Sequence, residues 1–251
     1  MENRIVKRPL NRREFLKAAG AFAALALAGS LPFAAFAQSS AKLKIGTLGS
    51  GRVGSAIGKA WVKAGHEVMF SSLDLESDRK LAASIGGGAR AGTPREAAAF
   101  GEVLLVSVPY AALPGIGRDL GGLIKGKVIV DTSNPIVARD GDMAVAAREK
   151  GAGLASSEFL PGTRIVRAFN AIGAARMGEA ASQSPRMGMP IAGDDAEAIR
   201  IVSALVREVG YDPVLVGTLA AMGKYLMPGT PLAGERSADE IRKVAATLKQ
   251  G

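Results

Sequence analysis

The sequence has no cysteine and only one histidine, His66, among its 251 residues. Without thiols the chain forms no disulfide, iron–sulfur cluster or zinc–thiolate site, and it has no cysteine nucleophile. One histidine also excludes a His-rich metal site. We interpret His66 as a turn residue and not a catalyst, because it precedes a predicted strand and lies far from the strand ends where ligands bind in open α/β sheets.

Charge is missing from residues 18–37, which are rich in Ala and Leu. The pair Arg12-Arg13 precedes this stretch, and Ala35-Phe36-Ala37 ends it with the small-x-small pattern of a signal peptidase site. The order resembles a twin-arginine export signal. We therefore predict a signal peptide over residues 1–37, cleaved after Ala37, with the twin-arginine export machinery as a partner and the periplasm as destination. An uncleaved anchor is the alternative, but the run is only mildly hydrophobic, so we expect no permanent membrane span.

The positive charge is modest once that segment is removed. Residues 1–37 contain six Lys/Arg and two Glu, so the formal charge falls from +9 to +5 over the remaining 214 residues. The basic residues are scattered along the sequence rather than clustered. This composition argues against a nucleic-acid partner.

Strand-like and helix-like segments alternate along residues 38–251, which predicts a single α/β domain with a C-terminal extension. We expect a Rossmann-type, doubly wound and mostly parallel sheet with helices on both faces. Strands are predicted at 42–48, 67–70, 103–108, 128–131, 164–169, 190–193 and 212–215. Helices are predicted at 51–64, 77–85, 113–120, 142–150 and 196–209, with further helices starting after Thr93 and Ser237. Asp194-Asp195 is interpreted as a helix cap and not as a metal ligand.

The segment Gly49-Ser50-Gly51-Arg52-Val53-Gly54 fits the G-x-G-x-x-G pattern between the first predicted strand and helix. The first glycine allows the tight turn, the second lets the backbone approach a pyrophosphate, and the third allows close helix packing. Amide groups at the start of the helix then point at the phosphates. This context predicts that the loop binds a dinucleotide.

The tip of the second strand carries Ser71 and Ser72 where NAD-binding proteins usually place a carboxylate. The first carboxylate, Asp74, comes beyond that position. Hydroxyl groups, with Arg52, Arg79 or Lys80 nearby, suit a 2′-phosphate better, so we favour NADP and leave NAD open. In the alternative interpretation the two serines are turn residues and Asp74 caps the next helix.

Several longer motifs resemble the NADPH-dependent oxidoreductases related to deazaflavin (coenzyme F-420) reductases. The N-terminal part also resembles pyrroline-5-carboxylate reductase and the cytosolic domain of metalloreductases. The motifs that carry the resemblance span most of the chain after the signal: residues 45–54, 64–68, 106–110, 126–135, 160–170 and 191–195.

The resemblance implies hydride transfer between NADP(H) and a flavin or deazaflavin that serves as small-molecule electron acceptor. Such a transfer holds two rings face to face and needs no general acid or base, so no catalytic residue is assigned. It implies that the pyrophosphate lies on Thr47, Leu48, Gly49, Ser50, Gly51, Arg52, Val53 and Gly54, and the adenosine ribose phosphate on Ser71 and Ser72. The residues expected to line the nicotinamide are Val108, Pro109, Tyr110, Asn134 and Pro135, with residues 168–172 near the second ring.

Two segments depart from the family pattern. Leu73 stands where the family often has arginine, and residues 222–232 do not match the expected ending. An imine or 2-hydroxyacid reductase is the alternative enzyme; it usually needs a separate helical domain, and about 40 residues follow the last predicted strand. A non-catalytic, exported nucleotide-binding domain is the third hypothesis. A homodimer is left open.

Overall fold

The computed structural model describes residues 42–178 and 180–249. The predicted signal peptide, residues 1–37, lies outside the described residues. Within the described part of the chain, no helix is both long enough and apolar enough to cross a bilayer. The described residues form one compact unit.

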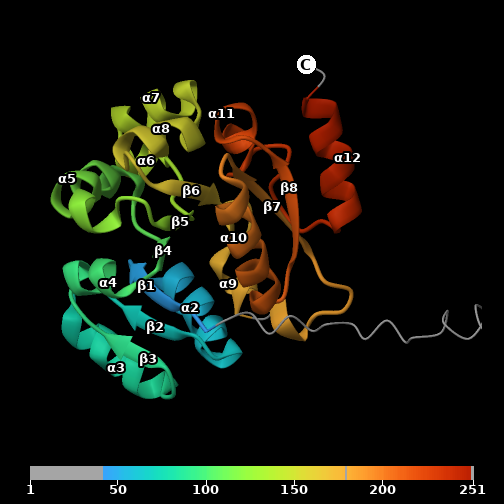
Figure 1. Ribbon diagram of the computed structural model, residues 1–251. Helices are drawn as coiled ribbons and strands as arrows, with labels where there is room; N and C mark the ends of the chain where they lie inside the picture. Colours follow the sequence, from blue (N-terminus) through green and yellow to red (C-terminus); the bar gives the residue numbers. More distant parts are fainter. Residues whose placement is uncertain (1–41, 179, 250–251) are drawn as a thin grey trace, which may run out of the picture. The chain divides into compact units, whose positions relative to one another are not determined.

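One eight-stranded sheet runs through this unit in the order β3-β2-β1-β4-β5-β6-β7-β8 (Figure 1). Strands β1 to β6 are parallel, β7 is antiparallel to β6, and β8 is parallel to β7. The prediction of a mostly parallel, Rossmann-type sheet is confirmed. The strands are β1 (Lys44–Leu48), β2 (Glu67–Phe70), β3 (Ala89–Ala91), β4 (Val103–Val106), β5 (Val128–Asp131), β6 (Arg164–Arg167), β7 (Gly188–Gly193) and β8 (Asp212–Gly217).

The central strands are apolar throughout because helices cover both of their faces. In β4, Val103 and Leu105 pack in one core cluster while Leu104 and Val106 pack in the other. The alternation of side chains across the strand therefore supplies both layers at once.

The first layer packs against one face of the sheet and contains α2 (Arg52–Ala64), α3 (Leu75–Ile85), α9 (Ala174–Met177), η2 (Ala180–Ser182) and α10 (Ala196–Val209). Within it, Trp61 of α2 is fully buried and donates a 2.9 Å hydrogen bond from Nε1 to the carbonyl of Leu205 in α10. The indole thus joins two helices that are far apart in sequence.

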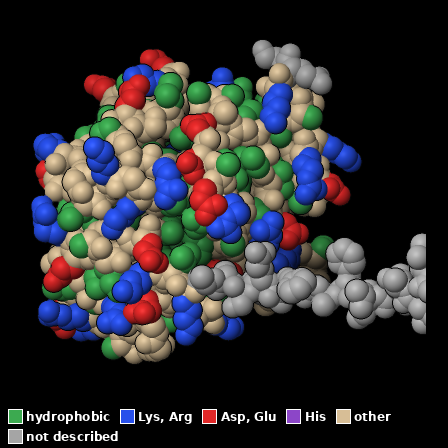
Figure 2. All heavy atoms as spheres, in the orientation of Figure 1, with side chains coloured by type: hydrophobic (Ala, Val, Ile, Leu, Met, Phe, Trp, Pro, Cys, Tyr) green, Lys and Arg blue, Asp and Glu red, His purple; other side chains and the backbone are tan. Residues whose placement is uncertain are grey.

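The second layer covers the opposite face with α4 (Pro94–Phe100), η1 (Tyr110–Ala112), α5 (Leu113–Ile124), α7 (Asp142–Lys150), α8 (Ala152–Phe159) and α11 (Leu219–Met222). The short helix α6 (Val137–Asp140) precedes α7, and η3 (Gly223–Tyr225) follows α11. The last helix, α12 (Ala238–Leu248), packs against β7 and β8 at the edge of the sheet (Figure 1). On the face drawn in Figure 2, basic and acidic side chains are mixed over the described surface.

Two predicted strands end earlier than expected, for reasons visible in the backbone. The strand predicted at 103–108 ends at Val106, three residues before Pro109, where η1 follows. The strand predicted at 164–169 ends at Arg167, because Phe169 adopts a positive φ of 65° that is incompatible with an extended strand.

Candidate dinucleotide site

The glycine-rich loop leaves the carboxyl end of β1, which lies between β2 and β4. The chain order reverses here, since β2 and β3 follow on one side and β4 to β6 on the other. Open α/β sheets bind ligands at such a switch point, outside the carboxyl ends of the strands. The loop is held against the neighbouring strand tip by a 2.9 Å hydrogen bond from the amide of Gly49 to the carbonyl of Ser71.

The three glycines of the loop have different structural roles. Gly49 has φ 99°, and a Cβ there would lie 2.2 Å from the carbonyl oxygen of Ser107. A Cβ on Gly54 would lie 1.9 Å from the carbonyl oxygen of Gly49, so the third glycine lets α2 pack on its own loop. A Cβ on Gly51 would meet nothing within 4 Å. The first and third glycines are therefore required by the fold, whereas the second faces open space that a ligand can enter.

The N-terminus of α2 is left open to an anion. Its N-cap is Gly51, no side chain caps the first turn, and that turn carries no acidic residue. By contrast, the N-termini of five other helices are capped by Asp74, Thr93, Asp195, Thr218 and Ser237. Unpaired amides and the helix dipole favour a phosphate at such an end. Arg52, at the first helical position, is exposed beside it. These residues fit a dinucleotide pyrophosphate.

The two serines at the tip of β2, both predicted to bind the phosphate, differ in their exposure. Ser71 is fully buried and donates from its hydroxyl to the carbonyl of Thr47 at 2.5 Å. Its amide also bonds to Thr47 Oγ1 at 3.2 Å, so both residues hold β1 and β2 together. Ser72 is half-buried and reaches the surface. Asp74 caps α3 by accepting from the amide of Ser77 at 3.0 Å, as in the alternative interpretation.

Two other predicted contacts, Leu48 and Val53, pack into the core. Leu48 is buried in the cluster beneath α4 and α5, and Val53 is half-buried against the cluster beneath α2. Any contact these residues make with a pyrophosphate is through their backbone.

Asp78 lies at the same place, and the sequence analysis missed it. It projects from α3, is 1% exposed, and accepts hydrogen bonds from Ser72 Oγ at 2.9 Å and from Ser50 Oγ. The carboxylate therefore joins the glycine-rich loop to the tip of β2. An available signal was its position one turn before Ala82, on the buried face of an amphipathic helix, where an unpaired carboxylate is rare.

At the carboxyl end of β4, Val108 is half-buried and Pro109 is exposed. The side chain of Tyr110 points away from the surface: it is fully buried, and its hydroxyl donates to the carbonyl of Ala152 at 2.8 Å. Burial raises the pKa of Tyr110 to about 12. Only the backbone of Tyr110 is placed to meet a ligand at this end of the sheet.

Asp140 fixes two of the predicted nicotinamide segments relative to one another. Its carboxylate accepts from the amide of Ala111 at 3.3 Å and from the amide of Ile136 at 2.9 Å. Burial alone would raise the pKa of Asp140, but hydrogen bonds from Arg139 and the two amides outweigh it and hold that pKa below the ordinary value. The carboxylate ties the turn after Pro109 to the turn after Pro135, which is itself buried.

A buried polar cluster, which we call the β5–β6 cluster, follows at the ends of those strands. Asn134 donates to the carbonyl of Asn170 at 2.9 Å, and its side-chain oxygen accepts from Arg167 at 3.2 Å. Arg167 in turn donates to Asp131 at 2.7 Å. The cluster comprises Asp131, Ser133, Asn134, Arg167 and Asn170.

The β5–β6 cluster has two further features of a functional site. Ser133 Oγ, Arg167 Nε and Asn170 Oδ1 are buried and have no hydrogen-bond partner among the described residues. Between Arg167 and Asn170, Phe169 holds a left-handed backbone that costs about 1–2 kcal/mol in a residue with a Cβ. Unpaired buried polar atoms and backbone strain both gather at binding sites.

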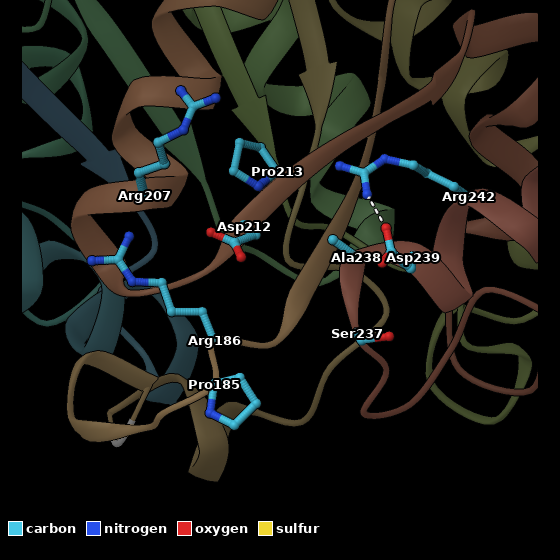
Figure 3. Close-up of a pocket in the computed structure, with 9 residues that line it drawn as sticks. All are labelled: Pro185, Arg186, Arg207, Asp212, Pro213, Ser237, Ala238, Asp239 and Arg242. Carbon is cyan, nitrogen blue, oxygen red and sulfur yellow. Dashed lines mark hydrogen bonds and ion pairs between the residues drawn. The ribbon is translucent and has the colours of Figure 1, made fainter. Parts of the chain in front are cut away.

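A separate hollow of about 430 Å³ lies at the start of β8 and α12 (Figure 3). Its arginines come from three places: Arg186 precedes β7, Arg207 lies on α10, and Arg242 lies on α12, where it pairs with Asp239 at 2.5 Å. None of the residues predicted to bind the dinucleotide lines this hollow.

The histidine also lies apart from the predicted dinucleotide site. His66 is buried, accepts a hydrogen bond from the amide of Leu43, and pairs with Glu208 at 2.7 Å. Its role is therefore structural.

Comparison with known proteins gives a family match and several relatives. The sequence profile of a family described as "NADP oxidoreductase coenzyme F420-dependent" matches residues 44–135. Metalloreductase STEAP3 of Rattus norvegicus is 30% identical over 181 residues, covering 71% of this chain and 34% of that protein. F420-dependent NADP reductase of Methanothermobacter thermautotrophicus is 28% identical over 180 residues, covering 66% of this chain and 77% of that protein.

Among solved structures, a hypothetical protein from Sinorhizobium meliloti (SMa0349) superimposes with a TM-score of 0.65 at 25% identity. The match covers 76% of this chain and 93% of that one. The matched part of the chain spans about a third of the length of the rat metalloreductase but most of the other two proteins.

The fold and the open helix N-terminus define a Rossmann-type dinucleotide-binding domain, and the likenesses are to NADP-dependent oxidoreductases. Residues 44–135 match the model of the NADP oxidoreductases described as coenzyme F420-dependent.

Proposed function

We propose that the protein transfers hydride between NADP(H) and a flavin or deazaflavin acceptor. The observation that carries the proposal is the arrangement at the carboxyl ends of β1, β4, β5 and β6. The uncapped N-terminus of α2 supplies a pyrophosphate site, and the β5–β6 cluster supplies buried polar groups at the ends of neighbouring strands.

The reaction needs positioning more than proton transfer. NADPH gives a hydride to the acceptor ring and becomes NADP⁺, and the acceptor takes one proton from water. With its pyrophosphate at the N-terminus of α2, the dinucleotide would place the nicotinamide over Val108 and Pro109, with Asn134 at the edge of the ring. The one nearby phenol, Tyr110, has a pKa raised to about 12 by burial, so it keeps its proton and takes no part in the transfer.

The acceptor class is supported by two relatives of different kinds. One is described as an F420-dependent NADP reductase and the other as a metalloreductase. A ring that accepts hydride is common to the deazaflavin and flavin acceptors. Ferric chelates are reduced one electron at a time and serve as the contrasting acceptor.

The test is NADPH oxidation, followed at 340 nm, with F-420, FMN and ferric chelates offered separately. We expect turnover with F-420 or FMN. Gly51→Val fills the open space before α2 and should abolish binding of NADPH. The matched control is Gly121→Val in α5, where an added Cβ also meets nothing within 4 Å, and which should bind NADPH as the parent does. Binding without oxidation by any acceptor would contradict the proposed activity and would favour a non-catalytic nucleotide-binding protein.

We further propose that residues 1–37 direct export through the twin-arginine machinery, with cleavage after Ala37. The motif Arg12-Arg13 ahead of an uncharged run supports this. Mass measurement of protein from the periplasmic fraction should give a chain that begins at Gln38, and Arg12→Lys with Arg13→Lys should leave the protein in the cytoplasm. Because this route carries folded proteins, the periplasmic protein should retain its nucleotide. Recovery of only nucleotide-free protein would contradict retention.

A further inference from the structure

At the adenosine end of the dinucleotide site, the serine hydroxyl groups already donate their protons to other groups of the protein. Ser50 and Ser72 both donate to the carboxylate of Asp78, and Ser71 donates to the carbonyl of Thr47. A serine hydroxyl has one proton and two lone pairs. In this arrangement Ser50 and Ser72 therefore present hydrogen-bond acceptors, not donors, to a ligand.

A phosphate and a ribose hydroxyl respond to this arrangement in opposite ways. The 2′-phosphate of NADP is an acceptor, so it gains nothing from oxygens that have given their protons to Asp78. The 2′-hydroxyl of NAD can donate to those same oxygens. The hydrogen-bonding pattern around Asp78 thus favours the unphosphorylated ribose.

The charges around the tip of β2 act in the same direction. Asp78 is buried and Asp74 caps α3, so two carboxylates stand close to the expected position of the 2′-phosphate. Leu73, which precedes Asp74, is fully exposed and carries no charge, so no cation lies at that position. Arg79, which follows Asp78 on α3, pairs with Glu76 at 3.4 Å. Arg52 on the loop and Lys80 on α3 are the cations that remain to meet a phosphate, and the carboxylates of Asp74 and Asp78 oppose them.

We propose that Asp78 sets the nucleotide preference of this protein and admits NADH alongside NADPH. The buried carboxylate turns the serine oxygens into acceptors for a ribose diol and repels a 2′-phosphate, while Arg52 retains a weaker attraction for it. This inference rests on the proposed function, because it requires a dinucleotide on the Gly49–Gly54 loop.

The experiment measures dissociation constants for NADH and NADPH by nicotinamide fluorescence in the parent protein and three variants. In the parent, we expect the two constants to lie within about tenfold of each other, a difference below about 1.4 kcal/mol. Asp78→Asn keeps the shape but removes the charge, and should shift the ratio towards NADPH by about tenfold or more. Leu73→Arg adds a guanidinium at an exposed position and should shift it the same way without changing the melting temperature.

Glu149→Gln is the control, because it removes one exposed carboxylate from α7, away from the tip of β2. It should leave the ratio within about twofold of the parent value, since exposed charges are screened by solvent. A parent protein that binds NADPH more than about a hundredfold tighter than NADH overturns the inference, as does an unchanged ratio in Asp78→Asn.

Two further outcomes concern a variant that does not fold and a parent that binds no nucleotide. If Asp78→Asn does not fold, the parent ratio and the Leu73→Arg shift decide the matter, and a Leu73→Arg ratio equal to that of the parent overturns the inference. If the parent binds neither nucleotide, the proposed function itself fails, which is a different result from binding with the wrong preference.

Discussion

Arg167 donates a 2.7 Å hydrogen bond to Asp131, and both side chains are completely buried at the ends of β5 and β6. Burying two charges is expensive, and their attraction offsets that expense only while both are present. Asn134 and the carbonyl of Leu226 contact the same guanidinium, at 3.2 Å and 3.4 Å. The pair is therefore the rigid centre of the β5–β6 cluster.

Removing one partner of this pair should be strongly destabilising. Asp131→Ala leaves an uncompensated buried guanidinium, and we expect the free energy of unfolding to fall by about 3–5 kcal/mol. Urea denaturation measures the change. Glu158→Ala, which breaks an exposed ion pair with Lys150, is the control and should cost less than about 1 kcal/mol. A loss of similar size in both variants would show that burial of the Arg167–Asp131 pair is not what matters.

The two glycines Gly51 and Gly54 should respond differently to the same change. Gly54→Ala forces a Cβ against the carbonyl of Gly49, and should lower the free energy of unfolding by about 1–3 kcal/mol. Gly51→Ala meets open space and should unfold like the parent while binding the dinucleotide more weakly. Thermal unfolding without nucleotide, followed by titration with it, separates the two effects. Equal destabilisation by both substitutions would contradict the assignment of Gly51 to the ligand.

Tyr110 gives a prediction at high pH. Its pKa is about 12 in the folded protein, raised by burial above the ordinary value of 10.0. The folded state therefore holds the phenolic proton more tightly, so the stabilisation is complete below about pH 10 and is lost as the pH rises towards about 12. Tyr110→Phe should cost about 1–3 kcal/mol at neutral pH, because it leaves the Ala152 carbonyl without its donor.

The pH dependence of Tyr110→Phe provides the check. The stability difference between parent and variant should be constant from about pH 6 to pH 9 and should shrink above pH 10. Between about pH 6 and pH 9, the parent and Tyr110→Phe should show the same pH dependence of the rate of NADPH oxidation. A titration step that is present in the parent and absent from the variant would mean that Tyr110 exchanges protons during the reaction.

Asp140 should affect both stability and nucleotide binding. Asp140→Asn weakens the bonds to the amides of Ala111 and Ile136 and should cost about 1–3 kcal/mol. The pKa of Asp140 lies below its ordinary value of 3.8, so this contribution is present above that pH and is lost as the pH falls through the lowered pKa. The variant should also bind NADPH more weakly, because Pro109 and Pro135 lose their common anchor. An unchanged affinity would limit Asp140 to a role in folding.

The fold was predictable where local pattern and tertiary packing agree. The apolar run at β4, the amphipathic α10 and the capping boxes at Thr93 and Ser237 all give the observed elements. The helix α8 was missed because its small residues, such as Gly153 and Ala155, have little hydrophobic contrast. Gly153 lacks a side chain because Arg167 and the loop at Gly223 pack closely on it, which no local pattern reveals.

The candidate site was predictable only in part, for a related reason. The glycine-rich loop has a spacing that carries its own mechanism, so Gly49 to Gly54 could be assigned from sequence. Asp78 and Asp140 were not assigned, because each joins segments whose proximity depends on the finished sheet. Ser71 shows the converse limit: its residue type suits a phosphate, but in the fold its hydroxyl is used by Thr47.

The bond from Trp61 to Leu205 gives the C-terminal part of the chain a role in the nucleotide site. The helix that directs its N-terminus at the phosphates is secured near its other end by a helix some 140 residues later in the sequence. The segment that the family model matches, residues 44–135, does not contain that support. A fragment cut at the end of that segment would expose an indole and lose one wall of its core. The stretch that identifies the nucleotide site is thus shorter than the stretch that must fold to hold it.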